Sequence, residues 1–332
     1  MLDGFMARYG SRTRDVVLTR GGHPLPNEES FASGAEALRV ADGNRERGER
    51  LVVLLSGGAS AMLAAPAPGV TLADKIALTR GLLLSGLPIA EINARRKKLS
   101  AIKGGKLAVR AGRSITFAIS DVHAPVEDDP SVIGSGPTVI GSGPTVTTDR
   151  SVGTVETTFV LAGSRRDAMD GASAEAVRLG YDVRRIDPPT LGEAREAAAR
   201  FVEVAATLRS PHRMAVIASG ETTVTITPDS HGRGGRNQEF ALAAALKIGD
   251  MRAGWALASI GTDGVDGPTD AAGAIADSTT LSRAAAAGLD PGVTLASHDS
   301  YRFFERLGDL VITGPTGTNV GDIQILAVQT PD

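Results

Sequence analysis

The sequence contains no cysteine among its 332 residues. Disulfides, thiol nucleophiles and cysteine-ligated metal sites are therefore excluded, and this composition fits the reducing environment of the cytoplasm. No apolar run is long enough to span a bilayer, and the N-terminal residues lack the basic-then-apolar pattern of a signal peptide. We therefore expect a cytoplasmic protein with no membrane partner.

A strong net charge is also missing, since the formal charge is −3 at pH 7 and the pI is about 6.0. Nucleic acid is therefore not expected as a partner. The histidines form no H-x-x-x-H or H-E-x-x-H pair for zinc, and no G-x-S-x-G elbow marks a serine nucleophile. What the chain does have is 40 glycines and 42% hydrophobic residues. That content supports the cores of one large or two smaller α/β domains.

Short apolar runs, typical of buried strands, alternate with helical patterns along the chain. The runs lie at residues 15–19, 51–55, 115–119, 158–162, 181–186, 214–218, 255–260, 310–313 and 323–328. Helical patterns cover residues 27–41, 74–85, 165–179, 191–208, 278–287 and 299–306. At least five of the runs end in Gly, Ser/Thr or Asp clusters. The alternation predicts an α/β fold with its ligand site at the carboxyl ends of the strands.

Residues 214–246 carry the densest pattern. Residues 219–223 read as the end of the first strand, and the alternation around Val224 and Ile226 predicts a second strand or hairpin arm. The loop GRGGRN (232–237) then opens directly into an Ala-rich helix. Glycines before a helix leave first-turn N–H groups free, and the two arginines offer bidentate forks, so we expect a bound phosphate. A surface turn with two solvated arginines is the alternative.

Two stretches in the first half of the chain are further candidates for anion binding, one through backbone N–H groups and one through basic side chains. The run SGGAS (56–60) follows a predicted strand, an arrangement that can surround a phosphate with backbone N–H groups, although an ordinary turn is the alternative. It is neither a Walker A loop nor a G-x-G-x-x-G fingerprint. Most charged side chains of the basic run 95–106 are expected on a solvent-exposed helix face. Lys103 stands directly before two glycines, and this position instead indicates a lysine that binds a polyanion.

Carboxylates follow two of the predicted strands. Asp121 stands at a strand end, a common position for a catalytic group or a Mg²⁺ ligand. Asp263, Asp266 and Asp270 lie among glycines and can gather a divalent cation, although their spacing is not that of an EF-hand. With the anion-binding loops, these carboxylates suit phosphoryl transfer.

Three smaller features complete the pattern. His23, between glycine and proline, is interpreted as a residue that braces its loop by hydrogen bonding. The heptapeptide at 132–138 is repeated at once at 139–145, a local duplication of which one copy is expected to be idle. Ser210-Pro211-His212 reads as a linker.

Eight motifs in this order together resemble the MOFRL-type glycerate kinases, a family also labelled hydroxypyruvate reductase. They are SGGAS (56–60), NARRKKLSAIKGG (93–105), SDV (120–122), IGSGPT (133–138), SGETTVT (219–225), GGRNQE (234–239), GTDGVDGPTDAAG (261–273) and TGPTGTNVGD (313–322). The resemblance implies two α/β domains with parallel or mixed sheets flanked by helices and an active site in the interdomain cleft. A Rossmann-like glycerate kinase domain would cover residues 1–210 and a MOFRL domain residues 211–332.

The resemblance further implies that ATP, with Mg²⁺, phosphorylates D-glycerate to 2-phosphoglycerate. Arg236 would hold a phosphate or the substrate carboxylate, and Asp121 would act as base or metal partner. The predicted cofactor-binding residues are Ser56, Gly57, Gly58, Ser60, Lys103, Gly220, Glu221, Thr222, Gly234, Gly235, Asn237 and Asn319. The predicted metal ligands are Asp121, Asp263 and Asp266.

The sequence departs from the family's pattern at three places. The usual family chain is longer at its N-terminus, where a Gly-Lys-Ala segment supplies a lysine thought to be catalytic, and it is longer after the IGSGPT motif. The family also reads RKHLS where residues 96–100 read RKKLS. We therefore expect a shortened, less active chain whose first sheet exposes apolar side chains on one face.

Two other functions stay open at this point. The first is an NAD(P)H-dependent hydroxypyruvate reductase, which the lack of a G-x-G-x-x-G after any strand disfavours. The second is a non-catalytic remnant that binds nucleotide. The sequence also leaves open whether the protein is a homo-oligomer.

Overall fold

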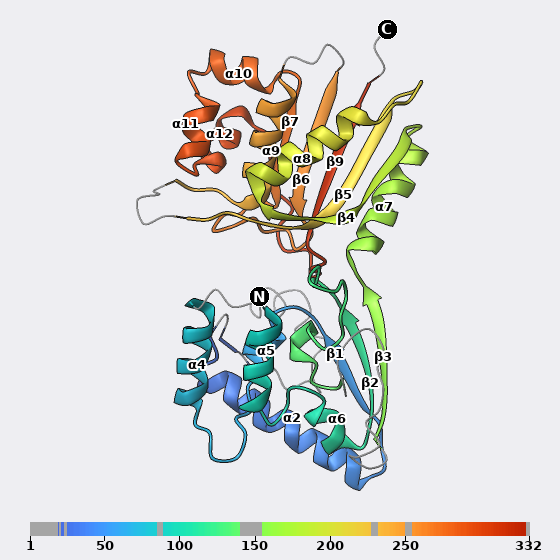
Figure 1. The fold of residues 1–332 in the computed structure, drawn as a ribbon, viewed down its shortest axis with the longest axis vertical. Coiled ribbons are helices and arrows are strands. Elements are labelled where there is room, and N and C mark those ends of the chain that lie inside the picture. The colour runs from blue at the N-terminus through green and yellow to red at the C-terminus, as the bar shows by residue number, and fades with distance from the viewer. Residues whose placement is uncertain are drawn as a thin grey trace. The chain divides into compact units, whose positions relative to one another are not determined.

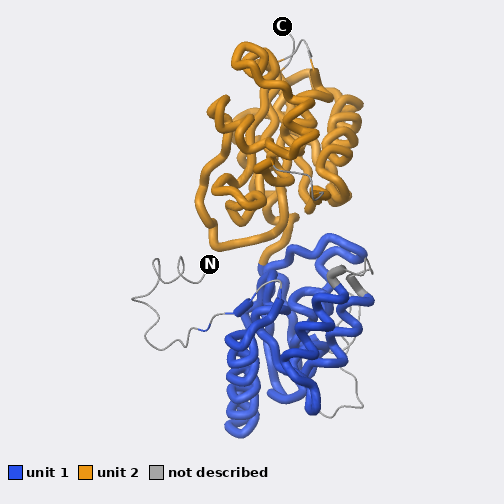
Figure 2. Tube along the Cα trace, turned by 90° about the vertical axis from the view of Figure 1, so that its left-hand side faces the viewer, with its two compact units in different colours: residues 1–162 blue, residues 163–332 orange. Residues whose placement is uncertain are grey.

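The computed structural model describes residues 19, 21–22, 25–84, 89–139, 155–226, 232–249 and 254–329. The chain divides into two compact units, Met1–Ala162 and Gly163–Asp332 (Figure 2). The division falls well before the predicted boundary after residue 210. The strand predicted at 181–186 belongs to the second unit's sheet, and the helices predicted at 165–179 and 191–208 pack on that sheet. The strand 15–19 and His23, which were predicted from the sequence, lie outside the described residues except for Thr19.

Unit 1 is built around a three-stranded sheet in the order β1-β2-β3 (Figure 1). The strands are β1 (Leu51–Leu55), β2 (Arg113–Ile119) and β3 (Glu156–Gly163), and β1 runs parallel to β2. The helices are α2 (Glu28–Glu46), α3 (Ala59–Met62), α4 (Leu72–Leu84), α5 (Ile89–Lys98) and α6 (Lys106–Ala111), and the 3₁₀ turn η2 covers Ile133–Ser135.

Helix α2 begins at Glu28, close to the start of the predicted helical pattern at residue 27, because Asn27 and Ser30 form a capping box. The Asn27 side chain accepts the Ser30 N–H at 2.9 Å, and the Ser30 hydroxyl accepts the Asn27 N–H at 3.2 Å. One face of the sheet exposes apolar side chains, as expected. Val52 and Leu54 are 58% and 80% exposed, and the parallel register pairs Leu54 with Phe117, which is 37% exposed.

Unit 2 contains a six-stranded mixed sheet in the order β4-β5-β9-β6-β7-β8 (Figure 1). The strands are β4 (Asp182–Glu193), β5 (Met214–Thr223), β6 (Trp255–Gly261), β7 (Gly273–Asp277), β8 (Leu310–Val311) and β9 (Asp322–Val328). The helices are α7 (Arg165–Arg178), α8 (Ala194–Thr207), α9 (Arg236–Ile248), α10 (Thr280–Ala286), α11 (Pro291–Ala296) and α12 (Ser300–Leu307).

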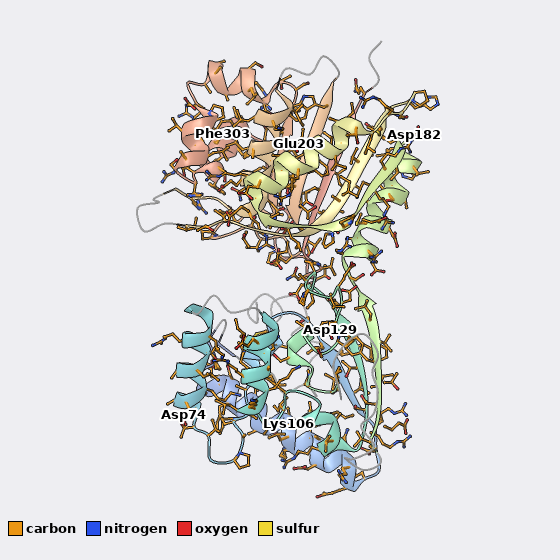
Figure 3. All side chains as sticks on the ribbon, in the orientation of Figure 1. Asp74, Lys106, Asp129, Asp182, Glu203 and Phe303 are labelled. Atoms are coloured by element: carbon orange, nitrogen blue, oxygen red, sulfur yellow. The ribbon has the colours of Figure 1, made fainter. Side chains whose placement is uncertain are left out.

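The alternation of side chains along β5 distributes these helices over the two faces of the sheet. Val216 and Ala218 face the large core formed with α8, α9 and α12, whereas Ala215 and Ile217 face Met169 of α7. The large core includes buried Phe303, which is labelled in Figure 3. Both units therefore confirm the predicted α/β fold with parallel and mixed sheets flanked by helices.

Several predicted element boundaries are wrong, and β5 shows why. The apolar run predicted a strand at residues 214–218, and β5 continues from there through Thr223, because this half of the strand pairs with β4 on one side and, up to Gly220, with β9 on the other. Residues 224–226 are not in a strand. The sequence reading also missed β7, α6 and α11, which are short and rich in Gly and Ala or begin at proline. Within the described residues, no helix is both long and apolar enough to cross a bilayer.

Candidate functional site

The N-terminus of α9, where the sequence predicted a phosphate, is occupied by a carboxylate of the protein itself. The N–H groups of Asn237 and Gln238 donate to the two oxygens of Asp266 at 3.0 and 2.9 Å. A side chain at Gly235 would collide with that carboxylate. The glycine loop therefore comes close to an anion as predicted, but this anion belongs to the chain.

Asp266 is deeply buried, with 1% of its surface exposed. Burial raises the pKa of its carboxyl to about 6, although the two backbone N–H groups act in the opposite direction. Asn237 adds a side-chain hydrogen bond to the same carboxylate at 3.3 Å. Because its oxygens accept these bonds, Asp266 holds the entry to α9 in place.

Arg236 presents its fork to a second buried carboxylate. Its Nε and Nη2 donate to the oxygens of Asp322 at 2.7 and 2.9 Å, and its Nη2 lies 3.4 Å from Glu221. Asp322 is fully buried and also accepts a bond from the Asn237 amide at 2.9 Å. Burial alone lowers the pKa of Arg236, but the hydrogen bond and charge of Asp322 outweigh it and hold that pKa above its ordinary value. Asp322 thus fixes the orientation of the guanidinium.

The remaining predicted ligand-binding residues of unit 2 have varied surroundings. Gly220 packs against the backbone of Thr190, so a side chain there would collide with β4. Thr222 is buried within β5, and the Asn319 side chain accepts the Gly321 N–H at 3.0 Å in the turn before β9. The structure therefore gathers Glu221, Arg236, Asn237, Asp266 and Asp322. The sequence reading missed Asp322 as a site residue, although it ends the quoted TGPTGTNVGD motif just where an apolar strand begins.

In unit 1, the structure joins two loops that the sequence reading considered separately. The Lys103 ammonium donates to the backbone carbonyl of Ser60 at 2.6 Å and to its hydroxyl at 2.9 Å. The Ser60 hydroxyl also lies 2.8 Å from that of Ser135, which donates to Asn93 at 3.3 Å. The first copy of the repeated heptapeptide therefore belongs to this network, while residues 140–145 of the second copy lie outside the described residues.

A narrow pocket, open to solvent and with room for about one water molecule, adjoins Ser60. Its walls include three cationic side chains, Lys75 of α4, Arg96 of α5 and Lys103. Burial lowers the pKa of Lys103 to about 6 and that of Lys75 to about 8, and the Arg96 charge adds to both shifts. The sequence reading missed Lys75 and Arg96. Arg96 stands one helical turn after buried Asn93, and this spacing could have placed it on the inner face of α5.

Asp121 lies in the loop that follows β2, beside the glycines that follow β1. A side chain at Gly57 would collide with the Asp121 carboxylate. The two parallel strands thus bring Ser56, Gly57 and Asp121 to the same edge of their sheet, as predicted. Gly58 has a φ of 78°, which lets the chain turn directly into α3.

The predicted metal ligands do not form a set within either unit. Throughout the described part of the chain, no group of three His, Cys, Asp or Glu residues could hold a metal ion. Asp263 accepts the Val265 N–H at 3.0 Å, and both oxygens of Asp266 accept backbone N–H groups.

Comparison with known proteins gives two family matches. Residues 2–159 match DUF4147, described as a domain of unknown function, and residues 214–322 match the MOFRL family. A provisionally named hydroxypyruvate reductase from Agrobacterium vitis is 37% identical, over 97% of this chain and 91% of its own length. A glycerate 2-kinase from Pyrococcus horikoshii is 36% identical, over 96% of this chain and 80% of its own length. The crystal structure of glycerate kinase from Thermotoga maritima superposes with a TM-score of 0.80 at 36% identity, covering 93% of this chain and 80% of that one.

Proposed function

Because the chain belongs to the glycerate kinase family with DUF4147 and MOFRL domains, we propose that it phosphorylates D-glycerate at the expense of ATP. The 2-hydroxyl oxygen would form a new bond to the terminal phosphorus of ATP, and the bond from that phosphorus to the bridging oxygen of ADP would break. The hydroxyl proton would pass to a base. The products would be 2-phosphoglycerate and ADP.

One observation carries this proposal. The similarity to the Thermotoga maritima glycerate kinase covers 93% of the chain, so it includes residues from both compact units and from both sets of candidate groups. The 36% sequence identity over that span goes beyond a shared fold alone. A kinase therefore accounts for more of the chain than a simple binding module does.

Two residues take direct roles in the proposal. Arg236, oriented by Asp322, would bind the substrate carboxylate or a phosphate through the edge of its guanidinium that Asp322 does not occupy. Asp121 would accept the proton of the 2-hydroxyl, because it is a carboxylate at a strand end, next to glycines that let a substrate approach. Asp322 would be a positioning residue.

Mg²⁺ is the cation that we propose to accompany ATP. Asp266 does not fit as a ligand, because its oxygens are used at the start of α9, and Asp263 has committed one oxygen to a backbone N–H. Asp121 is the predicted ligand that remains, as an alternative to its role as the base and not in addition to it. Mg²⁺ is usually held by one or two carboxylates and by substrate phosphates, so a complete cage of side chains is not required. The steps proposed here do not depend on a metal held by the protein.

A pair of assays tests the proposal. The first measures ADP formation with D-glycerate and ATP, and the second measures NAD(P)H oxidation with hydroxypyruvate. Glycerate-dependent ADP formation without hydroxypyruvate-dependent NAD(P)H oxidation is expected. Activity in the second assay alone would establish a reductase, and nucleotide binding without turnover in either assay would establish a non-catalytic protein.

A further inference from the structure

We propose that Lys75, Arg96 and Lys103 form a binding site for a phosphate group within unit 1. The three cations come from α4, from α5 and from the turn that follows α5, and all three line the pocket beside Ser60. Arg96 Nη2 and Lys103 Nζ approach the same Ser60 carbonyl, at 3.5 and 2.6 Å. Three separate segments therefore bring positive groups to one point.

Lys75 and Lys103 are buried and Arg96 is half-buried, and within the described part of the chain all three lack the carboxylates that normally accompany buried cations. Lys75 is 6% exposed and Lys103 is 3% exposed. In the described ranges, the Lys75 ammonium has no hydrogen-bond partner, and none of the three cations forms an ion pair with a carboxylate. An unpaired buried ammonium costs several kcal/mol of stability, on the order of the whole stability of many domains. Such a cluster is explained if an anion completes it.

The acidic side chains that lie near Lys75 and Arg96 in the sequence have other partners. Asp74, next to Lys75 in the chain and labelled in Figure 3, accepts the N–H and hydroxyl of Thr71 at 2.9 and 2.6 Å. Glu91 on α5 pairs with Arg95, not with Arg96, at 2.6 Å. On α5, Arg95 is thus paired with a carboxylate, whereas Arg96 is not paired with one among the described residues.

The charge of the pocket favours phosphate over a carboxylate. A phosphate group carries close to two negative charges at neutral pH, and it can accept from an arginine fork and from two ammonium groups at once. Apolar neighbours, Leu78, Leu99, Ala64 and Pro26, line the rest of the pocket and strengthen these contacts by excluding water. The pocket is too narrow for a nucleobase, so the case for phosphate rests on the charges that line it.

The ionisation of the lysines supports this assignment. Because the pKa of Lys103 is lowered to about 6 and that of Lys75 to about 8, Lys103 is mostly neutral at pH 7.5 and Lys75 is partly so. A phosphate dianion raises both pKa values, so its binding takes up protons. A purely structural lysine pair would show no such coupling to phosphate.

This proposal rests on the proposed function only in that a kinase binds ligands with phosphate groups. Three such ligands are compared to identify which molecule supplies the phosphate group. Inorganic phosphate, ADP and 2-phosphoglycerate are titrated separately into the full chain by calorimetry at pH 7.5, in two buffers of different ionisation enthalpy. We expect at least one of them to bind saturably and with proton uptake. The ligand that binds identifies whether the group comes from the nucleotide, from the product or from free phosphate.

Two variants and one control decide the assignment. Lys75→Met and Arg96→Met should each weaken binding of that ligand by about tenfold to a hundredfold, the effect of losing one charged hydrogen bond. Lys98→Met, at an exposed position of the same helix α5, should bind as the unmodified chain does. Without ligand, Lys75→Met should be at least as heat-stable as the unmodified chain, because it removes an unpaired buried charge.

Each result counts for or against the site. Unchanged affinity in both variants, an equal loss in Lys98→Met, or no binding of any of the three ligands would overturn it. A chain that binds phosphate through these residues but has no kinase activity would refute the proposed function and leave this site standing. If the chain is an active kinase and its Lys75→Met and Arg96→Met variants bind and turn over normally, the proposed function stands and this phosphate site is refuted.

Discussion

Replacing Asp322 by asparagine perturbs the group that orients Arg236. Asp322 is fully buried and accepts the Arg236 fork at 2.7 and 2.9 Å and the Asn237 amide at 2.9 Å. Asparagine has nearly the same shape but replaces one acceptor oxygen with an NH₂ group, which would face N–H donors. Removal of one partner of a buried ion pair costs about 3–5 kcal/mol.

We expect the lower end of that range, about 3 kcal/mol, because the Arg236 side chain is 29% exposed and regains some hydration. Glu221 cannot replace Asp322, since it is itself 44% exposed and lies 3.4 Å from Nη2. For a unit of this size, the loss corresponds to a fall of roughly 6–12 °C in Tm. Turnover should fall as well, because the guanidinium loses its fixed orientation.

The assay is thermal unfolding of the full chain, followed by far-ultraviolet circular dichroism, beside steady-state kinase kinetics. Glu175→Gln is the matched control, since it removes an ion pair with Arg178 in which both side chains are more than half exposed. That change should cost less than about 0.5 kcal/mol. A Tm for Asp322→Asn within 2 °C of that of the control, on the order of the smallest shift expected for 1 kcal/mol, would refute the assignment of Asp322 as the buried anchor of Arg236.

Three further outcomes are expected. Arg236→Lys keeps the charge but loses the bidentate fork, so turnover should fall about a hundredfold, and near-normal kcat/KM would remove Arg236 from the site. Asp121→Asn should abolish turnover in a chain with an unchanged circular dichroism spectrum, and full activity would reduce Asp121 to a loop residue. The lowered pKa of Lys103, about 6, means that the unfolded chain binds more protons between about pH 6 and the ordinary lysine pKa of 10.5. Stability against urea should therefore rise with pH across that window, and Lys103→Met should flatten the rise; equal slopes would contradict the burial of a neutral lysine.

The sequence was most informative where a single segment decides the structure. The strand 51–55 and the start of the helix near residue 27 depend on neighbouring residues, and the structure confirms both. The meeting of Gly57 with Asp121 was also foreseeable, because parallel neighbouring strands bring their carboxyl ends together.

Where distant segments choose their partners, the sequence reading failed. The apolar pattern of the strand stops at residue 218, but β5 has hydrogen-bonding neighbours on both sides and continues through the polar residues 219–223. Arg236 offers a fork to any anion, and only the tertiary structure shows that Asp322 takes it. Lys75 and Arg96 lie on different helices, so no local pattern could join them with Lys103.

The central claim, that this chain phosphorylates D-glycerate, is tested most directly by following the phosphorus. Purified chain is incubated with ATP, Mg²⁺ and D-glycerate, and the phosphorus-31 spectrum is recorded over time, with an otherwise identical sample lacking glycerate as control. We expect the terminal phosphate signal of ATP to fall while signals of ADP and of 2-phosphoglycerate grow together, only when glycerate is present. Loss of ATP to free phosphate alone, or no change in either sample, would contradict the claim.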